Sequence, residues 1–189
     1  TTLVVYTSDQ GFFLGDHGWY DKRLMYEESL RMPLLVRYPP LTAAGSRCED
    51  IVTNVDLAPT LLEVAGVPLP DRLQGHSMVS SLAGEAPEHP QHDVYYRYWE
   101  HLSDPHRVPA HVGIRTDRYK LICYLDGPRA DGGPARDVEL FDLDGDDGEI
   151  RNLWGDPAHA EVAADLLALL RRRQLELGDD DLVGLPEPA

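Results

Sequence analysis

The sequence of 189 residues has only two cysteines, no long apolar run and far fewer basic than acidic residues. Its two cysteines, Cys48 and Cys123, match neither the spacing of a clustered metal site nor a disulfide framework. No apolar stretch approaches the roughly 20 residues that cross a bilayer, so no membrane contact is expected. Lys and Arg number 17 against 33 Asp and Glu, which gives a net charge of −16. A surface this acidic is not expected to bind nucleic acid.

The remaining composition is that of an ordinary globular protein, with 42% hydrophobic residues. A small anionic substrate stays compatible with the acidic surface, because a few fixed cations in a pocket outweigh distant, screened charges. The sequence identifies no cellular compartment.

The chain opens on a short apolar run with β-branched residues, Leu3–Tyr6. Such a run is typical of a strand buried on both faces in a parallel sheet. A central strand of a parallel sheet needs neighbours on both sides. We therefore expect the 189-residue chain to be the C-terminal part of a longer protein.

Asp9 and Gln10 follow this strand, in a segment that turns polar and glycine-rich. Ligands of open α/β sheets bind at the carboxyl ends of the strands, which is where Asp9 would lie. A carboxylate beside an amide carbonyl offers hard oxygen ligands, which suit Ca²⁺ or Mg²⁺ better than zinc. The residues alone leave an alternative open, in which Asp9 bonds nearby backbone amides in an ordinary turn.

The first half of the chain continues with short elements. A helix is expected over residues 25–31, and a strand over residues 33–38. Asp56 is expected to cap a helix from Leu57 to Ala65. Residues 67–92 are rich in Pro, Gly and Ser and contain His76, His89 and His92, which indicates a long loop with solvated histidines.

From Asp93 onward the pattern is one of short strands followed by one long helix. Strands are expected over residues 94–99, 111–115, 120–124 and 139–143, joined as an antiparallel sheet. The helix begins with Asp156 as its N-cap and Pro157 as its first residue, and it carries an apolar stripe at helical spacing. An acidic tail follows Gly178.

The acidic run from Asp144 to Glu149 suggests the calcium-binding loop of an EF-hand. That loop requires glycine at its sixth position and glutamate at its twelfth, where this chain has Glu149 and Gly155. A solvated acidic turn is therefore expected.

One line of sequence, SDQGFFLGDHGWYDKRLMYEESLRMPLLVRYP, resembles the metal-and-lysine segment of the type I sulfatases, which belong to the alkaline phosphatase superfamily. The resemblance is close from Thr7 to Pro39. It extends to the segments TNVDLAPTLLEVAGVPLP, GIRTDRYKLI and ELFDLDGDDGEIRNL, which together span most of the chain.

The resemblance implies roles for particular residues. In that family the acid after the strand and the residue that follows it ligate Ca²⁺, which carries over to Asp9 and Gln10, with Mg²⁺ or Mn²⁺ as weaker alternatives. The downstream lysine touches the sulfate and its leaving oxygen, which carries over to Lys22. His17 is a candidate either for binding substrate or for holding the loop. His111 is a candidate substrate-binding residue at the pocket rim, which the appended domain approaches in relatives.

The chain departs from the family pattern in two respects. The family more often has Asn or His where this chain has Gln10. The nucleophile of type I sulfatases is a formylglycine made from the cysteine of a Cys-x-Pro-x-Arg segment, and neither Cys48 nor Cys123 has that context. The N-terminal pair of aspartates that completes the metal site is also missing. We expect the isolated chain to be inactive and the missing N-terminal part to supply the nucleophile.

The resemblance implies an α/β fold in two domains. Residues 1–92 would be the C-terminal part of an alkaline-phosphatase-like parallel-sheet core with its connecting loop. Residues 93–189 would form an antiparallel four-stranded subdomain with a C-terminal helix and the acidic tail. The implied function is hydrolysis of the sulfate ester of a small molecule or saccharide.

Two alternatives to this function stay open. One is a phosphonate or phosphodiester hydrolase of the same superfamily, although such enzymes usually have His where this chain has Gln10. The other is a non-catalytic sulfatase-like binding module.

Overall fold

A computed structural model of the protein describes residues 2–125 and 137–179, which form two compact units. Of the described residues, 2–11 and 32–92 form the first unit, and 12–31, 93–125 and 137–179 form the second. The division into domains 1–92 and 93–189 stays a prediction, and the units differ from it in that residues 12–31 belong with the second. The acidic tail predicted after Gly178 lies, from residue 180 onward, outside the described residues.

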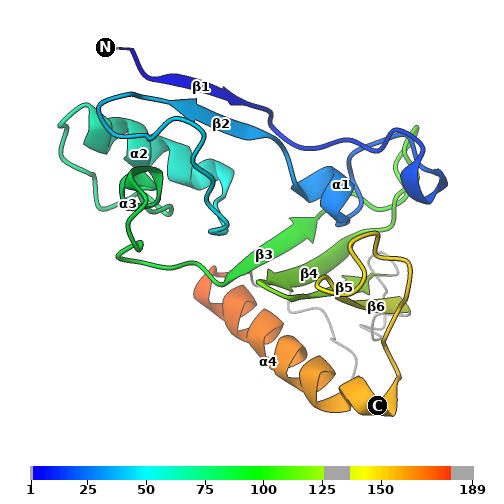
Figure 1. Ribbon diagram of the computed structural model, residues 1–189. Coiled ribbons are helices and arrows are strands. Elements are labelled where there is room, and N and C mark those ends of the chain that lie inside the picture. Colours follow the sequence, from blue (N-terminus) through cyan, green and yellow to red (C-terminus); the bar gives the residue numbers. More distant parts are fainter. Residues whose placement is uncertain (1, 126–136, 180–189) are drawn as a thin grey trace. The chain divides into compact units, whose positions relative to one another are not determined.

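The first unit contains an antiparallel pair of short strands, β1 (Val4–Thr7) and β2 (Leu34–Arg37) (Figure 1). Both strands lie where the sequence predicts them. The expected burial of the first strand on both faces is not met among the described residues, because Val4, Val5 and Tyr6 are exposed. The two strands pair with each other antiparallel rather than parallel.

Helix α2 (Leu57–Val64) follows a short 3₁₀ helix, η2 (Asn54–Asp56), in the first unit. Asp56 precedes α2 as predicted, but its side chain does not cap that helix. Its carboxylate instead accepts hydrogen bonds from the Thr53 backbone nitrogen (2.7 Å) and hydroxyl (2.9 Å). The Thr53 side chain in turn accepts the Asp56 backbone N–H, which completes a capping box at the start of the 3₁₀ turn. The expected long loop also contains a helix that the sequence analysis missed, α3 (Val79–Ala83).

The second unit is built on an antiparallel sheet with the strand order β3-β4-β5-β6 (Figure 1). This sheet confirms the predicted one. Its strands are β3 (Asp93–Tyr98), β4 (His111–Thr116), β5 (Tyr119–Tyr124) and β6 (Asp137–Asp142).

The predicted long helix is present as α4 (Ala160–Glu176), after a 3₁₀ turn, η3 (Pro157–His159). The Asp156 carboxylate accepts the Ala158 N–H at 3.0 Å, so Asp156 is the N-cap of that first turn. No helix among the described residues has both the length and the apolar character of a membrane span.

Each face of the sheet packs against another part of the second unit, because successive residues of a strand point to opposite faces. One face packs against α4 through a core that includes Val112, Ile114, Leu121, Cys123 and Leu140 (Figure 1). The opposite face contributes Ile122 and Phe141 to a second core with Phe13, Leu24, Met25 and Tyr26. These four residues belong to residues 12–31, which we call the motif segment. It contains η1 (Asp16–Gly18) and α1 (Glu27–Leu30).

The motif segment lies very close to the sheet at Gly113. A Cβ atom on Gly113 would lie 2.3 Å from the Met25 sulfur and 2.5 Å from the Leu121 carbonyl oxygen. Only glycine leaves room for Met25 there, and Met25 is fully buried.

A buried ion cluster also joins the motif segment to the sheet. Lys120 of β5 is fully buried, and its Nζ lies 2.9 Å from Glu27 Oε1 and 2.7 Å from Glu149 Oε1. Glu149 Oε2 accepts the Glu27 backbone N–H at 2.6 Å, so it also satisfies a donor at the start of α1. The guanidinium of Arg115 lies 3.5 Å from the second oxygen of Glu27. The prediction that the acidic run is solvated is therefore wrong for Glu149.

The two carboxylates of the cluster differ in their electrostatic balance. Burial alone would raise the pKa of Glu27, but Lys120 and Arg115 outweigh it, and the pKa lies below its usual value. At the more deeply buried Glu149, desolvation exceeds the attraction of Lys120 and raises the pKa.

A second buried polar group, His111, lies in an aromatic environment on the same face of the sheet. Its ring stacks on Tyr96 and Tyr98, with centroids 5.6 and 5.3 Å away, and tilts against Tyr124 at 5.5 Å. Nδ1 donates to the Pro109 carbonyl at 2.8 Å, while Nε2 is buried with no hydrogen-bond partner among the described residues. Burial lowers the pKa of His111 to about 4, which favours the neutral ring.

Removing the ammonium of Lys120 is expected to destabilise the second unit strongly. Lys120→Met leaves two carboxylates buried without their cation and should lower the free energy of unfolding by about 3 kcal/mol, measured by urea denaturation. Lys120→Met/Glu149→Gln should recover part of the loss. Arg118→Met, which breaks an exposed ion pair with Asp142, is the matched control and should cost far less. Equal losses for Lys120→Met and Arg118→Met would contradict this role.

His111 is expected to make stability depend on pH in a defined window. Its folded pKa of about 4 lies below the usual 6.5, so its contribution is present above about pH 6.5 and is lost as the pH falls toward 4. The loss should be about 3 kcal/mol. Unfolding free energies measured across this window should fall less for His111→Phe than for the parent chain. The exposed His89 provides a control, and a His89→Phe slope as shallow as that of His111→Phe would refute the assignment.

Candidate active site

The two predicted metal ligands lie in the first unit, directly after β1. Asp9 is exposed and Gln10 is half-buried. The Ser8 hydroxyl donates to Asp9 Oδ1 at 3.1 Å, and the Asn54 side-chain amide donates to the Asp9 carbonyl at 3.0 Å. Asn54 thus fixes the backbone of Asp9 from a position 45 residues away, a contact that the sequence analysis did not identify.

The donor set of Asp9 and Gln10 is compatible with Ca²⁺, because a carboxylate and an amide both present hard oxygens. Within residues 2–125 and 137–179, no three His, Cys, Asp or Glu side chains converge in a way that could hold a metal ion. Ca²⁺ takes roughly six to eight oxygens, so a site here needs ligands beyond these two.

Lys22 lies in the second unit, within a tightly hydrogen-bonded loop of the motif segment. The Phe13 N–H donates to the Asp21 carbonyl at 2.7 Å, and the Gly15 N–H donates to the Trp19 carbonyl at 2.9 Å. These bonds bring residues 13–15 alongside residues 19–21. Gly15 and Gly18 both have positive φ (121° and 75°), a backbone region that glycine enters without strain.

The backbone of Lys22 is held on both sides. Its N–H donates to the Asp21 carboxylate at 2.6 Å, and its carbonyl accepts from the Ser29 hydroxyl, also at 2.6 Å. Ser29 lies on α1 and is fully buried. The lysine side chain therefore starts from a backbone whose orientation is fixed.

The Asp21 carboxylate is a centre of several interactions. It forms an ion pair with Arg23, and its Oδ2 lies 2.9 Å from Nδ1 of His106. Burial alone would raise the pKa of Asp21, but the hydrogen bond from the Lys22 N–H and the Arg23 guanidinium outweigh it, so the pKa lies below its usual value. Asp21 is therefore an ionised acceptor at neutral pH.

His17 is mostly enclosed by the motif segment. Its ring lies against Tyr26 with centroids 4.4 Å apart and meets the edge of Phe13 at 6.0 Å. Nε2 lies 3.6 Å from Glu28 Oε1, and the side chain is only 15% exposed. These contacts are of the kind that would hold the loop, one of the two roles predicted for His17, and that role stays a prediction. Its role in binding substrate stays a prediction.

Tyr26 links His17 to the sheet. Its hydroxyl donates to Glu139 Oε2 at 2.8 Å, and the Tyr124 hydroxyl donates to the same oxygen at 2.9 Å. Tyr124 in turn contacts His111. His111 is fully buried in the sheet against Tyr96, Tyr98 and Tyr124, and its predicted contact with substrate stays a prediction.

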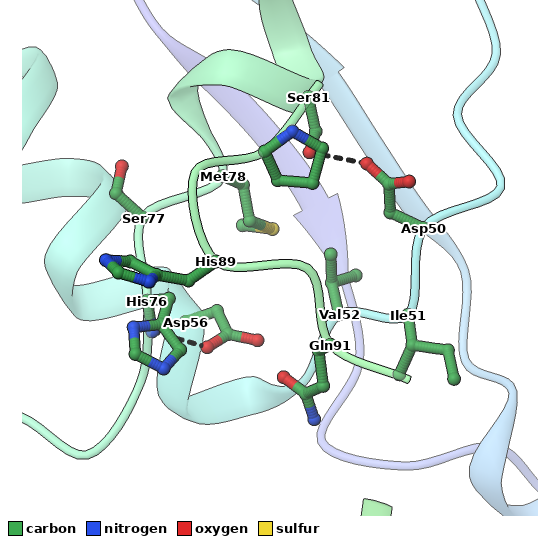
Figure 2. Close-up of a pocket in the computed structure, with 11 residues that line it drawn as sticks. Asp50, Ile51, Val52, Asp56, His76, Ser77, Met78, Ser81, His89 and Gln91 are labelled. Carbon is green, nitrogen blue, oxygen red and sulfur yellow. Dashed lines mark hydrogen bonds between the residues drawn. The ribbon is translucent and has the colours of Figure 1, made fainter. Parts of the chain in front are cut away.

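The first unit has a separate pocket, which Figure 2 shows. The rings of His76 and His89 lie against each other at its edge with centroids 5.0 Å apart. Asp50 accepts a hydrogen bond from Ser81 at 2.6 Å, and Asp56 accepts from the His76 backbone at 2.8 Å. None of the predicted site residues lines this pocket.

Four residues that contact a candidate residue or its neighbour within the same unit were not assigned these roles from the sequence: Asn54, Asp21, Ser29 and His106. Asp21 carries a signal in hindsight, because it directly precedes the lysine of the motif. Ser29, Asn54 and His106 lie 7, 45 and 85 residues, respectively, from the residues that they contact. Sequence spacing does not reveal such contacts.

Comparison with known proteins identifies the relatives of this chain. Residues 15–176 match the family model described as N-sulphoglucosamine sulphohydrolase, C-terminal. The chain is 42% identical over 182 residues to an N-acetylglucosamine-6-O-sulfatase of Bacteroides thetaiotaomicron, covering 95% of this chain and 31% of that protein. The chain thus spans about a third of the length of that curated relative.

Two solved structures share the fold. One is a protein in complex with its substrate D-glucosamine-2-N,6-O-disulfate, with a TM-score of 0.85 and 41% identity over 95% of this chain and 35% of that chain. The other is a phosphonate monoester hydrolase from Silicibacter pomeroyi, with a TM-score of 0.69 and 30% identity over 96% of this chain and 35% of that chain.

These findings confirm the resemblance to sulfatases and the predicted mixed α/β fold class, with its antiparallel sheet and terminal helix. The family match covers most of the described residues of both units. The chain belongs to the family of C-terminal domains of the N-sulphoglucosamine sulphohydrolase type, among the sulfatases.

Proposed function

We propose that the protein containing this chain hydrolyses sulfuric esters, and that this chain supplies part of its calcium site and the lysine that contacts the sulfate. The observation that carries the proposal is that two side chains of the sulfatase motif fix the backbone of Lys22. Asp21 accepts its N–H, and Ser29 donates to its carbonyl. The similarity to a 6-O-sulfatase across 95% of the chain supports it.

Each candidate residue has a defined task in this proposal. Asp9 and Gln10 hold Ca²⁺ with their side-chain oxygens, and the ion neutralises charge on the sulfate oxygens. The ammonium of Lys22 stabilises the negative charge that develops on the leaving oxygen. Neither Cys48 nor Cys123 lies in the sequence context of the nucleophile, so a formylglycine nucleophile is proposed in a part of the protein outside these residues.

The proposed substrate is a sulfated amino sugar. The names of two relatives support this class: an N-acetylglucosamine-6-O-sulfatase, and a protein solved with a disulfated glucosamine. His17 of the motif segment is proposed to contact the substrate. His111 is fully buried in the sheet, so we propose that it affects substrate binding through the tyrosines that pack on it.

A second candidate function is the hydrolysis of phosphonate monoesters, because one of the similar structures is an enzyme of that kind. Gln10 disfavours it, since phosphonate and phosphodiester hydrolases of the superfamily usually have His at that position, and zinc binds imidazole more readily than a side-chain amide. Comparing kcat/KM for a chromogenic sulfate ester and the matching phosphonate ester distinguishes the two. No turnover of either ester by the full-length protein would instead support a non-catalytic module.

The calcium assignment predicts that Asp9→Ala removes both bound calcium and sulfatase activity from the full-length protein. The reason is the loss of a carboxylate ligand at about 2.3–2.6 Å from the ion. Elemental analysis of the purified protein measures calcium independently of activity. Asp71→Ala, which removes another exposed acid of the first unit, is the control and should retain calcium. Full calcium occupancy in Asp9→Ala would exclude this ligand.

The lysine assignment predicts that Lys22→Ala lowers kcat by about 10²- to 10³-fold, the scale expected when one oriented stabiliser is lost. Aryl sulfates with good leaving groups should lose less than alkyl or sugar sulfates, because less charge on their leaving oxygen needs stabilisation. Arg31→Ala, which removes an exposed cation of the same segment, should keep kcat near the parent value. Equal losses on both kinds of ester would show that Lys22 only binds sulfate.

A further inference from the structure

The Asp21 carboxylate joins Lys22 to a distant part of the second unit. Its first oxygen accepts the Lys22 N–H, and its second meets Nδ1 of His106, which belongs to the loop between β3 and β4. A carboxylate only accepts hydrogen bonds when ionised, so Nδ1 of His106 is the donor. One side chain thus connects the backbone of the motif lysine to a residue 85 positions further along the chain.

The loop that carries His106 is ordered by its own contacts. The Leu102 N–H donates to the Val108 carbonyl at 2.9 Å, and the Arg107 N–H donates to the Ser103 carbonyl at 2.9 Å. Val108 is buried in the same core as Phe13 of the motif segment. His106 therefore approaches Asp21 from a loop that is packed against the motif segment.

We infer that Asp21 and His106 are positioning residues for Lys22, and that His106 acts on Lys22 only through the Asp21 carboxylate. This inference rests on the proposed role of Lys22. Asp21 fixes the peptide on the N-terminal side of Lys22, while Ser29 fixes the peptide on its C-terminal side. Losing the anchor lets the ammonium move away from the leaving oxygen, and errors of about 1 Å in such a group can cost 10²-fold in rate.

An ordinary structural ion pair would have different consequences. If Asp21 only stabilised the fold, through Arg23 and His106, its loss would lower the amount of active protein without changing how the active fraction treats different substrates. A positioning residue instead changes kcat in proportion to the demand for leaving-group stabilisation. Its effect disappears when the group that it positions is absent.

The kinetic test uses the full-length protein and two substitutions at each position. Asp21→Ala and His106→Ala should each lower kcat by about 10- to 100-fold with little change in KM, and more for sugar sulfates than for activated aryl sulfates. Asp21→Asn keeps an oxygen for the Lys22 N–H, and His106→Asn keeps a nitrogen donor near the position of Nδ1. Both should recover much of the loss. Arg31→Ala should match the parent enzyme.

The decisive comparison is a double-mutant cycle. In the Lys22→Ala background, adding Asp21→Ala or His106→Ala should lower kcat no further, because the group that they position is gone. Losses that multiply instead would overturn the inference. A loss that is the same for activated and unactivated esters, or a change confined to KM, would overturn it as well.

A second measurement separates failure of this inference from failure of the proposed function. Hydrogen exchange of the Lys22 amide, followed by NMR or mass spectrometry, reports the anchor without any substrate. Protection should fall in Asp21→Ala and in His106→Ala, and His106→Asn should restore it. Unchanged protection in both alanine variants would refute the anchor even in an active sulfatase. Lost protection in a protein with no sulfatase activity would refute the function alone.

Discussion

The second unit depends on the burial of one ammonium group, that of Lys120. Its charge would be costly in the sheet without the carboxylates of Glu27 and Glu149, and each of these comes from a different part of the chain. Glu27 begins α1 in the motif segment, while Glu149 ends the acidic turn after β6. Because Glu149 also accepts the Glu27 N–H, the cluster fixes the start of α1 as well as balancing charge. The motif segment, which contains Lys22, is therefore anchored to the sheet through Glu27, shortly after the lysine.

The sheet can hold this segment because its two faces have different compositions. On β5, Leu121 and Cys123 point into the core with α4, whereas Lys120 and Ile122 face the motif segment. On β6, Leu140 faces α4, whereas Glu139 accepts the hydroxyl of Tyr26. Burying the apolar face under a helix stabilises the sheet without specifying much else. The mixed face determines the position of the motif segment, because each of its polar groups requires a particular partner.

Much of this architecture could be predicted from sequence, for identifiable reasons. Strands β3 to β6 carry dense β-branched and aromatic residues, and α4 has a cap, a proline at its start and an apolar stripe. Local pattern was sufficient there. It was insufficient for Glu149, which the acidic run predicts to be solvated. The side chain is buried and pairs with Lys120, a residue 29 positions earlier. Local pattern also failed for Asp56, whose carboxylate is used by Thr53 and His76 rather than by α2.

The candidate site shows the same division between local and distant information. The motif alone is enough to propose Asp9, Gln10 and Lys22 as site residues, because all three lie within one short stretch of sequence. It does not identify what orients them, because Asn54 and His106 lie outside the motif and Ser29 lies on α1, seven residues after Lys22. In each unit the backbone carbonyl of a candidate residue accepts a hydrogen bond from a neutral side chain: Asn54 donates to the Asp9 carbonyl, and Ser29 donates to the Lys22 carbonyl. Holding the carbonyl leaves the side-chain charge of Asp9 or Lys22 unneutralised by the anchor. An anchor of opposite charge on the side chain itself would weaken the interaction with calcium or sulfate that the residue is proposed to make. These anchors on the backbone carbonyls therefore help to orient Asp9 and Lys22 without themselves neutralising the charge of either side chain.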